Sequence, residues 1–169
     1  MHTGPGFEAL RRGRVSQPGA RYLVTLTTAF RRSGISSAPV AAALRQEIDA
    51  LHSDHSWQLH GAVIMPDHLH ILVTLLERLT LGQAIGRLKA RTRATLAAAS
   101  LTWQGNYFDH RLRPEDELEL VLRYMFLNPH RAQLLPVTER YRWFWLGAAE
   151  RTWFHASPAD ELPAIVWLQ

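Results

Sequence analysis

The chain has 169 residues, of which 47% are hydrophobic and 20% charged, and it contains no cysteine. Its length suits one domain with a sizeable hydrophobic core, and the lack of cysteine excludes disulfide frameworks, cysteine-based zinc or iron–sulfur sites and thiol nucleophiles. No apolar run approaches the ~20 residues that span a bilayer, and the N-terminal segment lacks a signal-peptide core, so we expect a cytoplasmic protein with no membrane partner.

The charge is unevenly distributed along the chain. The formal net charge is +4, and 18 of the 19 basic residues are arginine. The segments 1–45, 46–77, 78–113 and 114–169 carry net charges of +6, −5, +6 and −3. Two separated basic blocks suggest a polyanion lying across one face, and the planar guanidinium suits phosphate. Arginine-rich codon usage is the alternative explanation for the arginine content.

The first half of the chain predicts an arm, three strands and a helix. Residues 1–19 combine Gly, Pro, Ser and Arg without periodicity, which is typical of a flexible basic arm. Three runs rich in apolar and β-branched residues predict strands at 21–30, 57–65 and 68–75. The last two are separated by only Pro66-Asp67, which favours a hairpin. Leucine and isoleucine at helical spacing predict a helix at 40–52.

The second half adds helices and a tail. Residues 81–99 predict an amphipathic helix, and 102–112 a strand or an extended turn. A third helix opens at 114–117 and ends at about Asn128, before Pro129, with a continuation to Leu135 left open. The order β-α-β-β-α-β predicts an α+β, ferredoxin-like antiparallel sheet with helices on one face, followed by a C-terminal helix carrying Tyr124. We expect a domain over 20–147 and a tail, 148–169, that packs on it.

Two histidines begin the strand predicted at 68–75. Side chains alternate along a strand, so His68 and His70 share one face while Leu69 points into the core. Imidazoles ~7 Å apart on one face can converge on a divalent ion. Nine histidines in the chain also make such a pair plausible by chance.

The third helix carries Tyr124 and Asn128, which are four residues apart and therefore share a helix face. In isolation such a pair is typical of a half-buried aromatic and a polar residue near a helix end. Together with the histidines, the amide oxygen of Asn128 would complete three ligands to one ion and leave positions for phosphate or water. Tyr124 would then stand beside that phosphate, where a nearby cation favours the phenolate.

These segments also resemble a known family. HGAVIMPDHLHILVTL resembles the His-hydrophobic-His segment of the HUH endonucleases, and WQGNYFDHRLRPEDELELVLRYMFLNPHRAQLL resembles the tyrosine helix of single-tyrosine transposases. The joint pattern, from about Tyr22 to Tyr141, is similar to that of the REP-associated tyrosine transposases, bacterial relatives of small insertion-sequence transposases. This chain departs from the family at Asp67, where Asn is common, and at Gln133, which replaces a frequent glycine.

The resemblance implies a metal-dependent, single-stranded DNA endonuclease and strand transferase. Tyr124 would be the nucleophile that forms a 5′-phosphotyrosine while a 3′-hydroxyl leaves, and His68, His70 and Asn128 would hold Mg²⁺ or Mn²⁺. The implied partner is single-stranded or hairpin DNA of the repetitive extragenic palindrome (REP) type. The implied protein is bacterial and nucleoid-associated, and acts as a monomer or homodimer.

The sequence also offers candidate DNA contacts. They are basic residues of the arm, of the second helix and of the D-H and R-A elements of the pattern: Arg11, Arg12, Arg14, Arg87, Lys89, Arg91, Arg93, His110 and Arg131. A solvated helix face is the alternative for the helical group, and a structural Asp109–His110 hydrogen bond is the alternative for His110. Trp103 and Tyr107 are candidates for base stacking or for core packing.

Two other functions remain open at this stage. One is a DNA-hairpin-binding protein without significant catalysis. The other is a metal-dependent hydrolase of small phosphoesters that shares only the paired histidines, although two +6 blocks exceed what a small substrate needs.

Overall fold

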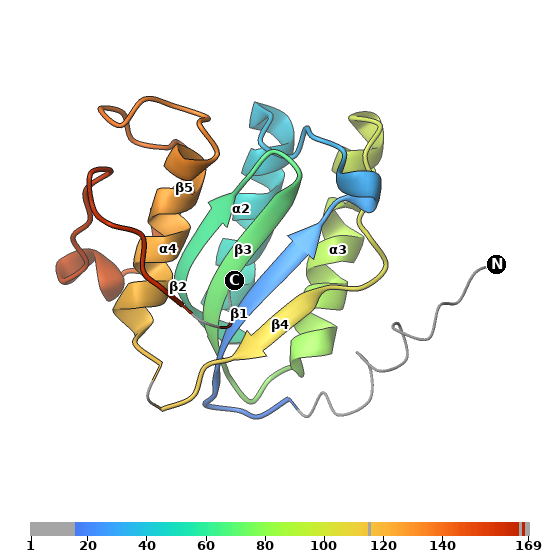
Figure 1. Cartoon of the computed structure of the whole chain (residues 1–169). Coiled ribbons are helices and arrows are strands. Elements are labelled where there is room, and N and C mark those ends of the chain that lie inside the picture. Colours follow the sequence, from blue (N-terminus) through green and yellow to red (C-terminus); the bar gives the residue numbers. More distant parts are fainter. Residues whose placement is uncertain (1–15, 115, 166, 168–169) are drawn as a thin grey trace.

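Five strands, three α-helices and two short 3-10 helices make up the part of the chain that the computed structural model describes, residues 16–114, 116–165 and 167 (Figure 1). In chain order they are β1 (Arg21–Thr27), η1 (Ala29–Arg31), α2 (Ala38–Ser53), β2 (Trp57–Ile64), β3 (His68–Leu75), α3 (Leu81–Ala98), β4 (Phe108–Arg111), α4 (Leu118–Arg131), β5 (Phe144–Leu146) and η2 (Glu150–Thr152). None of these helices has the length and hydrophobicity to span a bilayer, within the ranges described.

The strands form one antiparallel sheet in the order β4-β1-β3-β2-β5. The first four strands with α2 and α3 give the predicted β-α-β-β-α-β order, which confirms the α+β, ferredoxin-like arrangement. β2 and β3 form the predicted hairpin, and α2 and α3 lie within two residues of their predicted bounds. A capping box, in which Thr80 and Gln83 bond each other's backbone N–H, fixes the start of α3.

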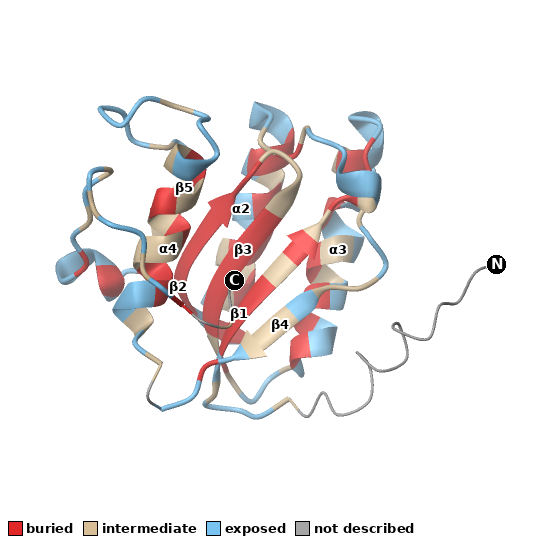
Figure 2. Cartoon of the chain, in the orientation of Figure 1, coloured by how far each residue is buried: buried red, intermediate tan, exposed pale blue. Residues whose placement is uncertain are grey.

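Helices cover both faces of the sheet. Leu69, Ile71 and Val73 of β3 pack in a first core with α2 and α3, which lie behind the sheet in Figure 1. Leu23 and Leu72 face the other way, into a second core with α4. β2 and β3 are therefore buried on both sides, as Figure 2 shows.

Two strands are shorter than the sequence predicted. β1 ends at Thr27 rather than Phe30, because Phe30 and Arg31 adopt positive φ angles of 57° and 52°. Within the predicted 102–112 segment, a strand forms only at β4, and Trp103 makes an isolated bridge to Thr28.

The third helix starts later than predicted, and it continues past Pro129, an outcome that the sequence left open. α4 starts at Leu118, because the Asp116 side chain accepts the Arg113 backbone N–H and forms a turn that competes with helix. α4 runs through Pro129 to Arg131. Proline deletes one backbone hydrogen bond and normally interrupts a helix, but the helix continues beyond it, and the Ala132 N–H bonds to the Asn128 carbonyl at its end.

The C-terminal region contains a strand that we did not predict. β5 lies beside β2, at the end of the expected 20–147 domain, where no strand was predicted. Its three residues are too few for an alternating pattern, so the pairing with β2 determines the strand. Beyond it, Phe154 and Ile165 enter the second core. Of the predicted basic arm, residues 1–15 lie outside the described residues, and Gly19 donates to the Leu75 carbonyl.

Candidate active site

The paired histidines lie side by side at the start of β3. Their ring centroids are 4.8 Å apart and the ring planes meet at 77°. Leu69 between them is fully buried in the opposite core, so the alternation predicted from the sequence is observed. His70 is buried, with 6% of its surface exposed, whereas His68 is half-buried.

Neighbouring oxygens orient both imidazole rings. His68 Nδ1 lies 2.6 Å from Asp67 Oδ1. Since a carboxylate only accepts, Nδ1 carries the proton and Nε2 keeps its lone pair. His70 Nδ1 is 2.8 Å from the Thr25 hydroxyl on β1, which leaves its Nε2 for another partner. A metal-binding histidine commonly has its second ring nitrogen held in this way.

The charges at this end of the sheet keep Asp67 ionised and His70 neutral. Burial raises the pKa of Asp67, but the hydrogen bond from His68 and the interactions with His68 and the Arg31 guanidinium outweigh it, so the pKa lies below its usual value. Burial, reinforced by His68, lowers the pKa of His70 to about 3. A neutral imidazole is the form that binds a metal.

The Asp67 carboxylate is also held from its other side. Arg31 Nε lies 2.9 Å from Asp67 Oδ2, while 17% of the Asp67 side chain is exposed. Asp67 is therefore a hydrogen-bonded anchor for His68 and not a solvated turn residue.

α4 lies across the second core from β3 and places Tyr124 next to the histidines. The ring centroids of Tyr124 and His70 are 6.1 Å apart, in an edge-on arrangement. α4 approaches the sheet closely at Gly61, where a Cβ would lie 2.7 Å from Leu122 Cδ2. Tyr124 is half-buried and so retains a route to solvent.

Asn128 is half-buried one turn after Tyr124 and shares its face of α4. An amide oxygen together with two imidazoles would make a donor set that fits Mn²⁺ well and Mg²⁺ less well, since imidazole is softer than the oxygen ligands that Mg²⁺ prefers. Within the described ranges, no cluster of three or more His, Asp or Glu side chains offers an alternative metal site.

The candidate DNA contacts on α3 lie on the other side of the sheet from this site. Arg87 pairs with Asp54 and with Glu47 of α2 (Nε–Oε1 2.9 Å), and Arg91 lies 3.7 Å from Glu47. Lys89 donates to three consecutive backbone carbonyls of residues 104–106. Arg93 is exposed. The paired arginines stabilise the contact between α2 and α3, a role that a helical-face pattern does not reveal.

The remaining candidates are dispersed. His110 stacks on Trp167, with ring centroids 3.6 Å apart. Arg131 is exposed in the last turn of α4. Trp103 and Tyr107 pack against the first core, so packing is the better interpretation of both. Arg11, Arg12 and Arg14 lie outside the described residues.

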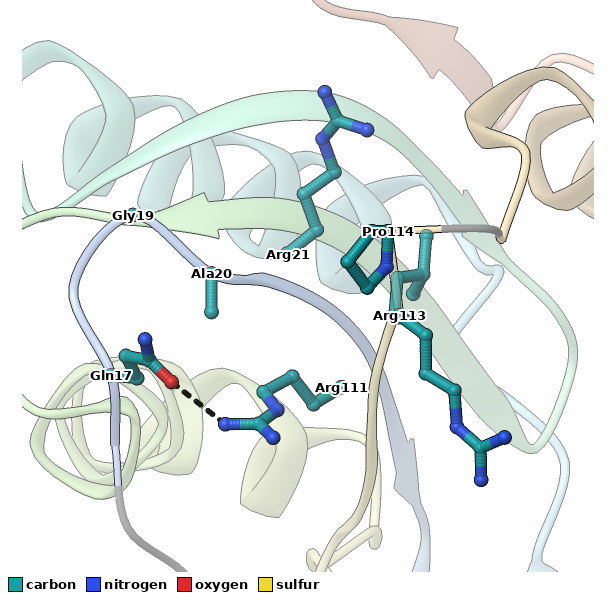
Figure 3. Close-up of a pocket in the computed structure, with 8 residues that line it drawn as sticks. Gln17, Gly19, Ala20, Arg21, Arg111, Arg113 and Pro114 are labelled. Atoms are coloured by element: carbon teal, nitrogen blue, oxygen red, sulfur yellow. Dashed lines mark hydrogen bonds between the residues drawn. The ribbon is translucent and has the colours of Figure 1, made fainter.

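The structure adds cationic residues that the sequence analysis did not select. Arg21, Arg111 and Arg113 line a cavity of about 440 Å³ at the start of β1. Figure 3 shows that Arg111 turns toward Gln17, to which it donates a 2.7 Å hydrogen bond, whereas Arg21 and Arg113 extend in other directions. Separated guanidinium groups suit an extended polyanion better than one small anion. The sequence signal that could have identified these three arginines is their position in the two basic segments, 1–45 and 78–113.

Known proteins are similar to this chain in fold and in family. A solved structure of a REP-associated tyrosine transposase bound to a REP hairpin is 17% identical, with a TM-score of 0.74 over 90% of this chain and 93% of that one. A putative transposase from Deinococcus radiodurans is 18% identical, with a TM-score of 0.48 over 79% and 92% of the two chains. No curated protein matches significantly. The family model "Transposase IS200 like" matches residues 16–125, and the chain therefore belongs to the IS200-like transposase family.

Proposed function

We propose that this transposase nicks and rejoins single-stranded DNA beside a REP-type hairpin, through a covalent 5′-phosphotyrosine formed by Tyr124. The observation that carries the proposal is the 6.1 Å approach of the Tyr124 ring on α4 to His70 of the paired histidines on β3. A phenol next to two oriented, metal-competent imidazoles is the arrangement that nucleophilic attack on a phosphodiester requires. The hairpin substrate is inferred from the REP hairpin in the structurally similar transposase.

In this mechanism His68, His70 and Asn128 would hold a divalent cation, Mg²⁺ or Mn²⁺. When bound, the cation polarises the scissile phosphate and offsets the charge that develops on it. The neighbouring residues keep the imidazoles ready for it: Asp67 holds His68, and Thr25 holds His70. These contacts fix the ring orientations before the DNA arrives, which lowers the cost of assembling the site.

Tyr124 supplies the covalent chemistry. Its phenolic oxygen attacks the phosphorus, the bond from phosphorus to the 3′-oxygen of the preceding nucleotide breaks, and the phenolic proton passes to solvent. The released strand ends in a 3′-hydroxyl, and the downstream strand stays on Tyr124 through its 5′-phosphate. Because one phosphodiester has replaced another, a second 3′-hydroxyl can reverse the step and join strands.

The test is an adduct assay with hairpin DNA labelled at its 3′ end. With Mn²⁺, the label should migrate with the protein on a denaturing gel. Tyr124→Phe should lose the adduct and keep its affinity for the hairpin. Tyr107→Phe is the matched control, because Tyr107 packs on the core behind the sheet, and it should form the adduct at the parental rate.

Other results would select the alternative functions. Hairpin binding without any adduct from the parent protein would indicate a binding protein that lacks catalysis. Undiminished DNA cleavage by Tyr124→Phe would indicate a metal-dependent phosphoester hydrolase, with water as the nucleophile. Affinity for the hairpin should fall steeply as the salt concentration rises, since phosphate contacts release counterions.

A further inference from the structure

Phe30 is a large aromatic side chain with no role in packing. It is 96% exposed, the most exposed large hydrophobic side chain among the described residues. Burial of a phenylalanine normally stabilises a fold considerably, so an exposed ring contributes nothing to the stability of this one. The position calls for a different explanation.

The backbone around Phe30 holds the ring in the solvent. Phe30 has φ 57° and ψ 20°, and Arg31 has φ 52°. Two consecutive residues other than glycine in the left-handed region cost free energy. Local and tertiary contacts hold this turn: the buried Thr28 hydroxyl donates to the Arg32 carbonyl (2.7 Å) within the turn and to the distant Asp67 carbonyl (3.1 Å), and the Ala29 N–H donates to the Thr102 carbonyl (2.8 Å). The fold thus maintains a strained turn that displays an aromatic ring.

The turn is also cationic. Arg31 and Arg32 directly follow Phe30, and both are exposed; 68% of the Arg31 side chain is accessible even though it pairs with Asp67. Arg32 makes a hydrogen bond of 3.4 Å to the Ser100 carbonyl, which orients it along the surface. An aromatic ring beside guanidinium groups is the combination that binds single-stranded nucleic acid.

The turn adjoins the candidate active site. Arg31 contacts Asp67, which contacts His68 (2.6 Å). Thr27, three residues before Phe30, pairs directly with His68 across the sheet. A DNA strand whose phosphate lies between the histidines and Tyr124 would therefore have its neighbouring nucleotides close to this turn.

We propose that Phe30 stacks on an unpaired nucleobase of the single-stranded segment next to the scissile phosphate, while Arg31 and Arg32 contact the adjoining backbone phosphates. The proposal rests on the proposed function, because it takes the histidines and Tyr124 as the cleavage point. It assigns a base-binding role to one residue of the turn, and it implies that the nucleotide spacing between stacked base and cleaved bond is constant.

The experiment is a double-mutant cycle between the protein and the DNA. Proteins carry Tyr124→Phe so that no cleavage interferes, and a fluorescent hairpin with single-stranded flanks is titrated with each. Phe30→Ala should weaken binding roughly 5- to 150-fold. An abasic site is then placed at each flank position in turn. At one position it should weaken binding by the protein that retains Phe30 by the same factor as Phe30→Ala does. At that position it should not weaken binding by the Phe30→Ala protein any further.

Matched variants separate stacking from other effects. Phe30→Trp should retain affinity, whereas Phe30→Leu, apolar but not aromatic, should lose most of it. Val137→Ala removes the next most exposed apolar side chain, which is 63% exposed, and should bind as the parent does. Unchanged binding by Phe30→Ala, equal losses at every abasic position, or parental affinity in Phe30→Leu would each overturn the proposal.

The adduct assay tests the proposed function separately. If the parent forms the adduct but the cycle shows no coupling, only the stacking role fails. If coupling is found but no adduct forms, the nicking role fails and the base-binding role stands.

Discussion

The position of Tyr124 depends on how closely α4 approaches β2 at Gly61. A Cβ at residue 61 would lie 2.7 Å from Leu122 Cδ2. Carbon atoms make favourable contacts at about 3.5–4.0 Å, so Gly61→Ala demands a movement of about 1 Å. Leu122 is fully buried and cannot turn into solvent. The strain must be relieved by moving Leu122 or the whole helix.

We expect Gly61→Ala to reduce both stability and DNA cleavage. Overpacking of a dense core costs about 1–3 kcal/mol, which urea denaturation would measure. Tyr124 is two residues from Leu122 on the same helix, and a misplacement of about 1 Å in a catalytic group can cost about 100-fold in rate. Single-turnover adduct formation with Mn²⁺ would measure that loss.

Two further variants make this prediction refutable. Gly86→Ala introduces the same methyl group on α3 where no neighbouring atom lies within 4 Å, and it should stabilise the protein by about 0.5–1 kcal/mol with an unchanged rate. Adding Leu122→Val to Gly61→Ala should restore part of the loss, because the two residues share the contact. If Gly61→Ala alone behaves as the parent in both assays, the close approach does not position α4.

Three more outcomes follow from the polar contacts. Asp67→Ala should weaken Mn²⁺ binding about 10- to 100-fold in calorimetric titrations. Asp67→Asn should weaken it less, because the amide oxygen can still accept the hydrogen bond from His68. Equal Mn²⁺ affinities in the parent and both variants would contradict the anchoring role of Asp67. Glu150→Ala should cost at least about 1–3 kcal/mol in urea denaturation, since the buried His60 Nδ1, 2.6 Å from Glu150 Oε1, loses its partner. Hydrogen bonds from Ser56 and Arg87 lower the pKa of Asp54 from 3.8 to about 2, so the contribution of Asp54 to stability is complete above about pH 4 and disappears as the pH falls toward 2. Asp54→Asn should therefore flatten the dependence of the free energy of unfolding on pH in that interval. An unchanged pH dependence would show that this pairing contributes nothing.

Local sequence patterns predicted the elements that carry the proposed site. The alternation of β3 placed His68 and His70 on one face, and the four-residue spacing placed Tyr124 and Asn128 on one face of α4. Both predictions depend only on the repeat of a single strand or helix, which neighbouring residues determine. The same reasoning ordered the strands and helices of the ferredoxin-like core.

Other features were inaccessible from the sequence because partners distant in the chain create them. The arginines of α3 looked available for DNA, but Arg87 is paired with acids of α2. β5 exists through its pairing with β2. Phe30 looked like the end of a strand, but Thr28 is hydrogen-bonded to the distant Asp67 carbonyl and the backbone at Phe30 adopts a left-handed conformation.

The sequence by itself therefore determined which side chains of each element share a face, since the periods of the strand and the helix are properties of the local backbone. Only the tertiary structure decided which faces meet: that α4 crosses to the opposite side of the sheet from α2 and α3, and that Tyr124 consequently lies beside His70. That choice depends on long-range packing, such as the space that Gly61 leaves for Leu122, and no local repeat encodes it.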